Sequence, residues 1–147
     1  MSIADELEGS WALVAWEQRY EDGRVVTPMG SDPAGVITYT GGRMQCVMAR
    51  RSRSPFVTGG QWDASQAERA TAYDECMAYA GSYTVDGDEV SHHVDIALFP
   101  NWVGGVQRRR ARLDGDRLEL VADLDQGTPQ ARSAHLVWRR LAPGSPL

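Results

Sequence analysis

Turn dipeptides that contain glycine divide much of this chain into short segments, and they constrain its fold more than any other feature. Asp22-Gly23, Gly41-Gly42, Gly87-Asp88 and Gly115-Asp116 each separate two runs with strand character. Such dipeptides supply the positive φ angles that tight hairpins need. Because tight hairpins join antiparallel neighbours, the sequence predicts an antiparallel meander.

The runs between these turns predict eight strands, and a ninth short strand is expected near residues 24–27. The eight cover Ser10–Tyr20, Gly35–Thr40, Arg43–Arg50, Gly81–Asp86, Glu89–Leu98, Val106–Leu113, Arg117–Asp123 and Arg132–Leu141. Closing a meander into a barrel removes its exposed edges. The predicted fold class is therefore all-β, an eight- to nine-stranded antiparallel up-and-down barrel, and the length of 147 residues suggests a single domain over 1–147.

One segment departs from the strand pattern. Residues 64–80 contain neither Gly nor Pro and predict a helix, with Asp63 as its cap, Gln66 in the capping-box position and Gly81 at its end. One face of this helix carries Ala70, Tyr73, Met77 and Ala80. We expect that face to pack over the barrel or across its open end.

Composition narrows the class of protein. Hydrophobic residues make up 42% and charged residues 24%, which indicates a globular chain. No apolar run is long enough to span a bilayer, so no membrane partner is expected. The net charge of -5 argues against nucleic acid, and the arginines of Arg108–Arg112 would divide between two faces of a strand.

The sequence also bears on cellular compartment and covalent chemistry. The acidic start MSIADELEG has no signal-peptide pattern, and Cys46 and Cys76 lie far apart. Reduced thiols in a cytoplasmic protein are therefore expected. All fifteen basic residues are arginine, so no lysine can form a Schiff base.

Two-residue turns fix cross-strand register, so the inner wall of the barrel can be predicted. Tyr83 should lie opposite His92, and Tyr39 opposite Met44. The expected inner wall consists of Ile37, Tyr39, Met44, Cys46, Met48, Tyr83, Val85, Val90, His92, Val94, Ile96, Ala111, Leu113, Leu118 and Leu120, with Gln107 and Arg109 on the same face. Apolar walls with a few polar groups are typical of a small-molecule pocket.

His92 stands in an otherwise apolar row, and two interpretations remain open. It can be a core histidine whose ring bonds the Tyr83 hydroxyl, or it can face a ligand. Arg109 favours a ligand, because a guanidinium on an inner wall needs an acceptor. That acceptor is expected to be Glu17, Glu119 or an anionic ligand.

No metal or cofactor site is expected. His92 and His93 are adjacent in a strand and point to opposite faces, so they cannot share one metal ion. The chain has no glycine-rich phosphate loop. Cys46 lies in a row with Met44 and Met48, which indicates an inert thiol in the core.

Four segments together resemble a known family. They are GSW (Gly9–Trp11), DPAGVITYTGGRM, YAGSYTVDGDEVSHHVDIALFPNWVG and LDGDRLEL, in that order. The chain is similar to the bacterial lipocalin-like domain family. This resemblance implies a barrel around a small-molecule cavity, with Trp11 closing one end and Arg139 or Arg140 packed on its ring. Small barrels that resemble this family include cofactor-free cyclases and isomerases.

Two functions fit these features. The first is a cofactor-independent cyclase, isomerase or dehydratase acting on a hydrophobic, polyketide-like molecule. His92 would titrate near neutrality as general acid or base, while Tyr83 and Arg109 would stabilise an oxyanion. The alternative is a binding or carrier protein for a small hydrophobic ligand. A haem site ranks last, because His135 is expected to be exposed.

Either function would use the same pocket, and the oligomeric state stays open, with a homodimer among the options. The predicted catalytic residues are His92, Tyr83 and Arg109. The predicted ligand contacts are Tyr39, Met44, Cys46, Met48, Tyr73, Ile96, Asn101, Trp102 and Gln107.

Overall fold

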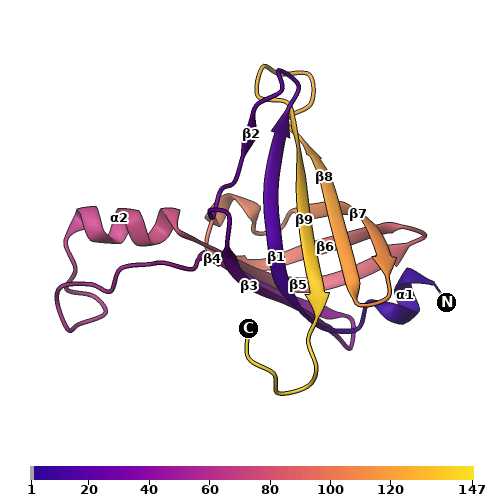
Figure 1. The fold of residues 1–147 in the computed structure, drawn as a ribbon, viewed down its shortest axis with the longest axis horizontal. Coiled ribbons are helices and arrows are strands. Elements are labelled where there is room, and N and C mark those ends of the chain that lie inside the picture. The colour runs from indigo at the N-terminus through magenta and orange to yellow at the C-terminus, as the bar shows by residue number, and fades with distance from the viewer. Residues whose placement is uncertain (1) are drawn as a thin grey trace.

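The long strands pair in sequence order around a closed sheet (Figure 1). The computed structural model describes residues 2–147. Its strands are β1 (Gly9–Tyr20), β2 (Val25–Val26), β3 (Pro33–Thr40), β4 (Arg43–Arg50), β5 (Cys76–Asp86), β6 (Glu89–Ala97), β7 (Val106–Asp114), β8 (Arg117–Leu124) and β9 (Arg132–Arg140). Two α-helices, α1 (Ile3–Glu6) and α2 (Gln66–Asp74), and a 3-10 turn η1 (Pro100–Trp102) complete the elements.

Pairing between the first and last long strands closes the barrel. β1 pairs with β9 from Trp11 opposite Arg140 to Tyr20 opposite Arg132. The sheet order is β2-β1-β3-β4-β5-β6-β7-β8-β9, so β2 is an extra strand at the edge of β1. The predicted antiparallel up-and-down barrel is confirmed.

The hairpin turns set the register that their sequences predict. Tyr39 lies opposite Met44, Tyr83 opposite His92, and Leu113 opposite Leu118. Alternate residues are buried where a strand follows such a turn regularly, as in β4, where Met44, Cys46 and Met48 point inward. The predicted inner wall is confirmed except at one position in β6.

That exception is Ile96, which is 67% exposed although an inner position was expected. A β-bulge between β5 and β6 reverses the side-chain alternation, since Ala80 lies opposite Ile96 and Gly81 opposite Val94. Gly81 permits this close approach, because a Cβ at this residue would lie 1.7 Å from the His93 carbonyl oxygen. Beyond the bulge Ala97 takes the inner side, opposite Tyr79.

The helix prediction over 64–80 is too long. The helix covers Gln66–Asp74, and Ser65 rather than Asp63 caps it, in a capping box with Glu68. Residues from Cys76 onward belong to β5, because they pair along the full length of β4 and bury Tyr79. Gly81 is accordingly a strand residue rather than a helix end.

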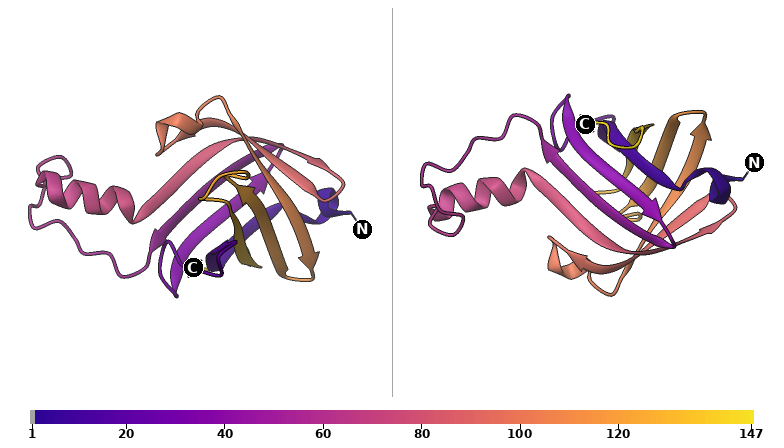
Figure 2. Two further views of the ribbon diagram at one scale, coloured as in Figure 1. Left: turned by 90° about the horizontal axis from the view of Figure 1, so that it is seen from above. Right: turned by 90° about the horizontal axis from the view of Figure 1, so that it is seen from below.

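Helix α2 does not cover the barrel as expected. It lies on an arm between β4 and β5 that extends away from the barrel in each view (Figures 1 and 2), and it has no buried residue. Tyr73 on this helix is 46% exposed. Among the described residues, no helix combines the length and the apolar character that crossing a membrane would require.

One end of the barrel is closed by Trp11. Its ring is fully buried and its indole nitrogen donates to the Leu7 carbonyl oxygen at 2.9 Å. The Arg140 guanidinium lies 4.1 Å from the ring centroid, while its nitrogens donate to the carbonyl oxygens of Glu6 and Glu8. The predicted cation–π contact is therefore confirmed, and Arg140 is the partner.

Candidate functional site

A cavity of about 340 Å³ occupies the end of the barrel away from Trp11. Its wall comes from the second half of β1, the first half of β5 and the strands between and beyond them. The lining residues are Trp16, Gln18, Val26, Pro28, Ile37, Cys46, Met48, Met77, Tyr79, His92, Trp102, Gln107, Arg109, Leu120, Leu124, Arg132, Ala134, Leu136 and Trp138. This volume is near the lower end of the range of about 300–1,000 Å³ typical of ligand pockets, so it suits a small molecule.

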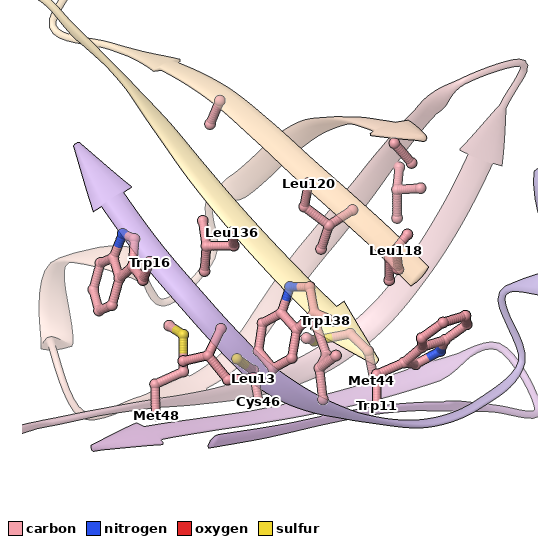
Figure 3. Close-up of a cluster of buried hydrophobic side chains, with 14 of the residues drawn as sticks. Trp11, Leu13, Trp16, Met44, Cys46, Met48, Leu118, Leu120, Leu136 and Trp138 are labelled. Carbon is pink, nitrogen blue, oxygen red and sulfur yellow. The ribbon is translucent and has the colours of Figure 1, made fainter. Parts of the chain in front are cut away.

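The apolar part of the wall is continuous with the core. Figure 3 shows Trp11 and Met44 at one end of the buried cluster, with Trp16 and Met48 toward the other end. Leu136 and Leu120 lie above them on β9 and β8. The core thus fills the closed end of the barrel and leaves space toward the opposite end.

His92 is fully buried on the cavity wall and bonds two tyrosines. Its Nε2 lies 2.7 Å from the Tyr39 hydroxyl, and its Nδ1 lies 2.8 Å from the Tyr79 hydroxyl. Both ring nitrogens are therefore engaged. Tyr83 lies opposite His92 as predicted, but its ring packs edge-on against Tyr39 and it is not a hydrogen-bond partner of the histidine in residues 2–147.

The imidazole is neutral at physiological pH. Burial lowers the pKa of His92 to about 3, and the positive charge of Arg109 acts in the same direction. The expectation that His92 titrates near neutrality is wrong, because the apolar wall disfavours its charged form.

Counting protons assigns the tautomer of His92. Within residues 2–147 the fully buried Tyr39 hydroxyl has His92 Nε2 as its single hydrogen-bond partner, so Tyr39 donates its proton there. Nδ1 then carries the imidazole proton and donates it to the Tyr79 oxygen. This leaves the Tyr79 O–H proton available to the cavity, which Tyr79 lines.

Arg109 is half-buried and has no carboxylate partner in the described part of the chain. Its guanidinium donates to the Arg108 carbonyl oxygen at 3.0 Å and to Gln107 Oε1 at 3.3 Å. The carboxylates expected to pair with it bind other arginines: Glu17 pairs with Arg19, and Glu119 pairs with Arg117. Both expectations are wrong, because each glutamate has an arginine two residues away on its own strand.

The structure brings six of the predicted site residues to the cavity. These are His92, Arg109, Cys46, Met48, Trp102 and Gln107. Burial raises the pKa of the Cys46 thiol to about 12, so the thiol stays protonated. A protonated thiol is a poor nucleophile, which agrees with the prediction that Cys46 is inert. The half-buried Trp102 packs edge-on against Tyr79, with 5.5 Å between ring centroids.

The other predicted site residues lie elsewhere. Tyr39 and Met44 are buried next to the cavity wall rather than on it, and Tyr83 packs on Tyr39. Tyr73 lies on the projecting helix, and Ile96 points outward beyond the bulge. Asn101 is exposed on η1 and is not among the lining residues.

Sequence reasoning missed Tyr79, together with Trp16 and Trp138. Tyr79 falls within the segment predicted as a helix, so it was not placed on the inner wall. It lies four residues before Tyr83 in the same strand and therefore points to the same face of the sheet. Trp16 and Trp138 lie on the first and last long strands, and no two-residue hairpin turn joins these two strands to each other. Their indole nitrogens are buried without a hydrogen-bond partner in residues 2–147.

The fold and the cavity define a small-molecule-binding β-barrel. Residues 8–141 match the family model described as a lipocalin-like domain. The chain therefore belongs to the lipocalin-like domain family, as its sequence motifs indicate.

Comparison with known proteins gives one curated relative and one solved structure. The relative is a 4'-hydroxy-3'-methoxypropiophenone carrier protein of Aspergillus oryzae, 36% identical over 84 residues, which are 50% of this chain and 75% of that protein. The structure is an uncharacterized protein from Bacteroides eggerthii with a TM-score of 0.45 and 15% identity, covering 91% of this chain and 98% of that one.

Proposed function

We propose that this protein binds and carries a small aromatic molecule that bears oxygen acceptors, held in the 340 Å³ cavity. The observation that carries the proposal is the guanidinium of Arg109, which has no carboxylate partner in the described residues and lies on a largely apolar wall. A charged group in such a place is stabilised by a ligand that supplies an acceptor.

The curated relative supports this ligand class. Its name describes a carrier of 4'-hydroxy-3'-methoxypropiophenone, an aromatic ketone with a phenolic hydroxyl. Such a molecule has one ring and several oxygen acceptors, which suits a cavity at the small end of the usual range. Aromatic side chains contribute to the cavity wall from three elements: Trp16 from β1, Trp138 from β9 and Trp102 from η1.

The state of His92 favours carriage over proton transfer. A general base needs a free lone pair and a pKa near the working pH. His92 has both nitrogens bonded to tyrosine hydroxyls and a pKa of about 3. Its arrangement is that of a group that orients Tyr39 and Tyr79.

A cofactor-independent cyclase, isomerase or dehydratase is the second candidate. The observation in its favour is that Arg109 and the Tyr79 hydroxyl line the same cavity, where both could donate to a developing enolate or phenolate oxygen. In this hypothesis His92 positions Tyr79, and Tyr79 with Arg109 stabilises the oxyanion. Tyr83 packs against Tyr39, so in this hypothesis it would only hold the Tyr39 ring in position.

Calorimetric titration with 4'-hydroxy-3'-methoxypropiophenone tests the proposal. We expect saturable binding of one molecule per chain, with the ketone recovered unchanged by chromatography after long incubation. Tyr79→Phe should weaken binding at least about tenfold, which is about 1.4 kcal/mol, because it removes the donor to the ligand. Tyr73→Phe is the matched control, since Tyr73 lies on the projecting helix.

Three results would count against carriage of this ligand class. Absence of binding would reject the class, and equal weakening by Tyr79→Phe and Tyr73→Phe would reject the cavity as the binding site. A new product that forms with wild-type protein and not with Tyr79→Phe would favour the enzyme.

A further inference from the structure

The polar groups on the cavity wall are nearly all hydrogen-bond donors. The wall contains two glutamine amide oxygens, and each accepts from an arginine: Gln107 Oε1 from Arg109 at 3.3 Å and Gln18 Oε1 from Arg132 at 3.0 Å. No aspartate or glutamate is among the lining residues. The donors on this wall therefore need acceptor atoms, and a ligand bound in the cavity would have to supply them.

The indole nitrogens of Trp16 and Trp138 add to this excess of donors. Both are buried without a partner within residues 2–147, and both rings line the cavity. In Figure 3 the two nitrogens lie on the side of their rings that faces Leu136 and Leu120, which are also lining residues. An unpaired buried N–H is costly, so oxygen acceptors on a ligand would stabilise this part of the wall.

The charge on the wall is positive and partly uncompensated. Of its two arginines, Arg132 pairs with Asp125, whereas Arg109 has no carboxylate partner in the described residues. The titratable groups that face Arg109 are Tyr39 on β3, Cys46 on β4, Tyr79 on β5 and His92 on β6. The lining residues of β1, β8 and β9 add no other titratable group besides Arg132.

None of these groups neutralises Arg109. Burial raises the pKa values of Tyr39, Tyr79 and Cys46 above their usual ranges, so all three stay protonated and uncharged. His92 is neutral for the same reason: burial disfavours its charged form, which for a base lowers the pKa. The charge of Arg109 is thus left for solvent or a bound anion.

We propose that the cavity binds its ligand as an oxyanion, the phenolate of a phenol that a para carbonyl group makes acidic, with the anionic oxygen bonded to Arg109 and Tyr79. This inference rests on the proposed binding function and specifies the charge state of the ligand. The phenol loses its proton to solvent on binding, and the guanidinium and the Tyr79 O–H donate to the phenolate oxygen. The carbonyl and ether oxygens are acceptors for the remaining donors of the wall.

The test is the ultraviolet absorption of bound 4'-hydroxy-3'-methoxypropiophenone as a function of pH, because a para-acyl phenol changes its spectrum when it ionises. A nearby guanidinium lowers the pKa of an acid by about 1 to 3 units. Burial acts in the opposite direction, as it does for Tyr79. We therefore expect the direct bond to Arg109 to leave the bound phenol ionising at a lower pH than the free phenol, by up to about 1 to 3 units. The methyl ether, 3',4'-dimethoxypropiophenone, cannot ionise and should bind at least about tenfold more weakly.

Variants identify the group responsible. Arg109→Gln should move the ionisation of the bound phenol back to the pH of the free phenol or above it, because only the effect of burial then remains. Arg109→Lys should keep part of the downward shift. Arg108→Gln is the matched control, since Arg108 is the adjacent residue on the exposed face and pairs with Glu89. Each variant is first checked for a cooperative thermal melt.

The possible failures are distinguishable. If the phenol binds but ionises at the same pH as when free, or if the methyl ether binds equally well, the oxyanion inference is overturned while the proposed binding function stands. An unchanged shift in Arg109→Gln would also overturn it, because another group would then hold the charge. If neither ketone binds, the proposed function fails for this ligand class and the inference fails with it.

Discussion

The Tyr39 hydroxyl lies 2.7 Å from His92 Nε2, and neither residue has any exposed surface. With the Tyr79 hydroxyl 2.8 Å from Nδ1, this contact satisfies a polar ring inside an apolar wall. His92 is thus a buried histidine with both ring nitrogens hydrogen-bonded, as one of the two interpretations expects. Its partners are Tyr39 and Tyr79 rather than the expected Tyr83.

Replacing His92 should cost stability through the tyrosines it leaves unpaired. His92→Phe leaves the hydroxyls of Tyr39 and Tyr79 without their histidine partner. Each stranded buried group costs about 1–3 kcal/mol, so we expect a loss of about 2–6 kcal/mol. Urea denaturation measures this difference. Adding Tyr39→Phe to His92→Phe should recover part of the loss, since one stranded hydroxyl is removed. His93→Ala, on the opposite face, should change little; an equal loss in both single variants would contradict the hydrogen-bond account.

The free energy of unfolding should fall in mild acid. The reason is that His92 is protonated there in the unfolded chain but stays neutral in the folded protein. The pKa of His92 is about 3 in the folded protein and near 6.5 in the unfolded chain, so the native state binds fewer protons between these values. Its stabilising contribution is complete above about pH 6.5 and declines as the pH falls toward 3. Each pH unit in this window costs about 1.4 kcal/mol.

The comparison that isolates this effect is wild type against His92→Gln. Urea denaturation between about pH 6 and pH 5 lies above the range in which most carboxylates titrate. His135, whose pKa burial also lowers, contributes equally to both proteins and cancels. Parallel stability curves for the two proteins would mean that His92 protonates as easily in the folded state as in the unfolded chain.

The bulge in β5 and β6 should depend on Gly81. Gly81→Ala places a methyl group 1.7 Å from the His93 carbonyl oxygen, so backbone must move, and we expect a loss of about 2–4 kcal/mol. Gly59→Ala is the control, because nothing lies within 4 Å of that added carbon and its φ is not positive. Similar denaturation midpoints for the two variants would show that the bulge accommodates a side chain.

Most of the fold follows from local sequence signals. The two-residue turns set the register that places Tyr83 opposite His92, and alternation along each strand then identifies the buried face. The contact of Arg140 with Trp11 follows from the family motif. These features are predictable because each depends on residues that are near in sequence or on a shared motif.

The parts that could not be predicted depend on tertiary pairing. Residues 76–80 have no helix-breaking residue, yet pairing with β4 makes them strand and brings Tyr79 to His92. The bulge that turns Ile96 outward follows from the close approach of Gly81 to β6, which the sequence of β6 alone does not reveal. Trp16 and Trp138 required knowledge of how the ends of the chain close the barrel.

Trp102 should matter more to binding than to folding. It is half-buried on η1, lines the cavity and packs against Tyr79 at 5.5 Å between centroids. We expect Trp102→Ala to raise the Kd for 4'-hydroxy-3'-methoxypropiophenone at least about tenfold, with a decrease in Tm of only a few degrees. The exposed neighbour Val103 provides the control, as Val103→Ala. A large decrease in Tm with an unchanged Kd would contradict this prediction and would mean that Trp102 only covers the end of the barrel.

Filling the cavity tests the central claim, that the ligand binds inside the barrel. Ala134 is buried on β9 and lines the cavity, whereas its neighbour Ser133 is not a lining residue. Calorimetric titration with 4'-hydroxy-3'-methoxypropiophenone compares Ala134→Trp with Ser133→Trp, after both variants are shown to melt cooperatively. We predict binding by wild type and Ser133→Trp, and at least about tenfold weaker binding by Ala134→Trp because the indole occupies the ligand's space. Binding by a folded Ala134→Trp as tight as that of wild type would contradict the claim.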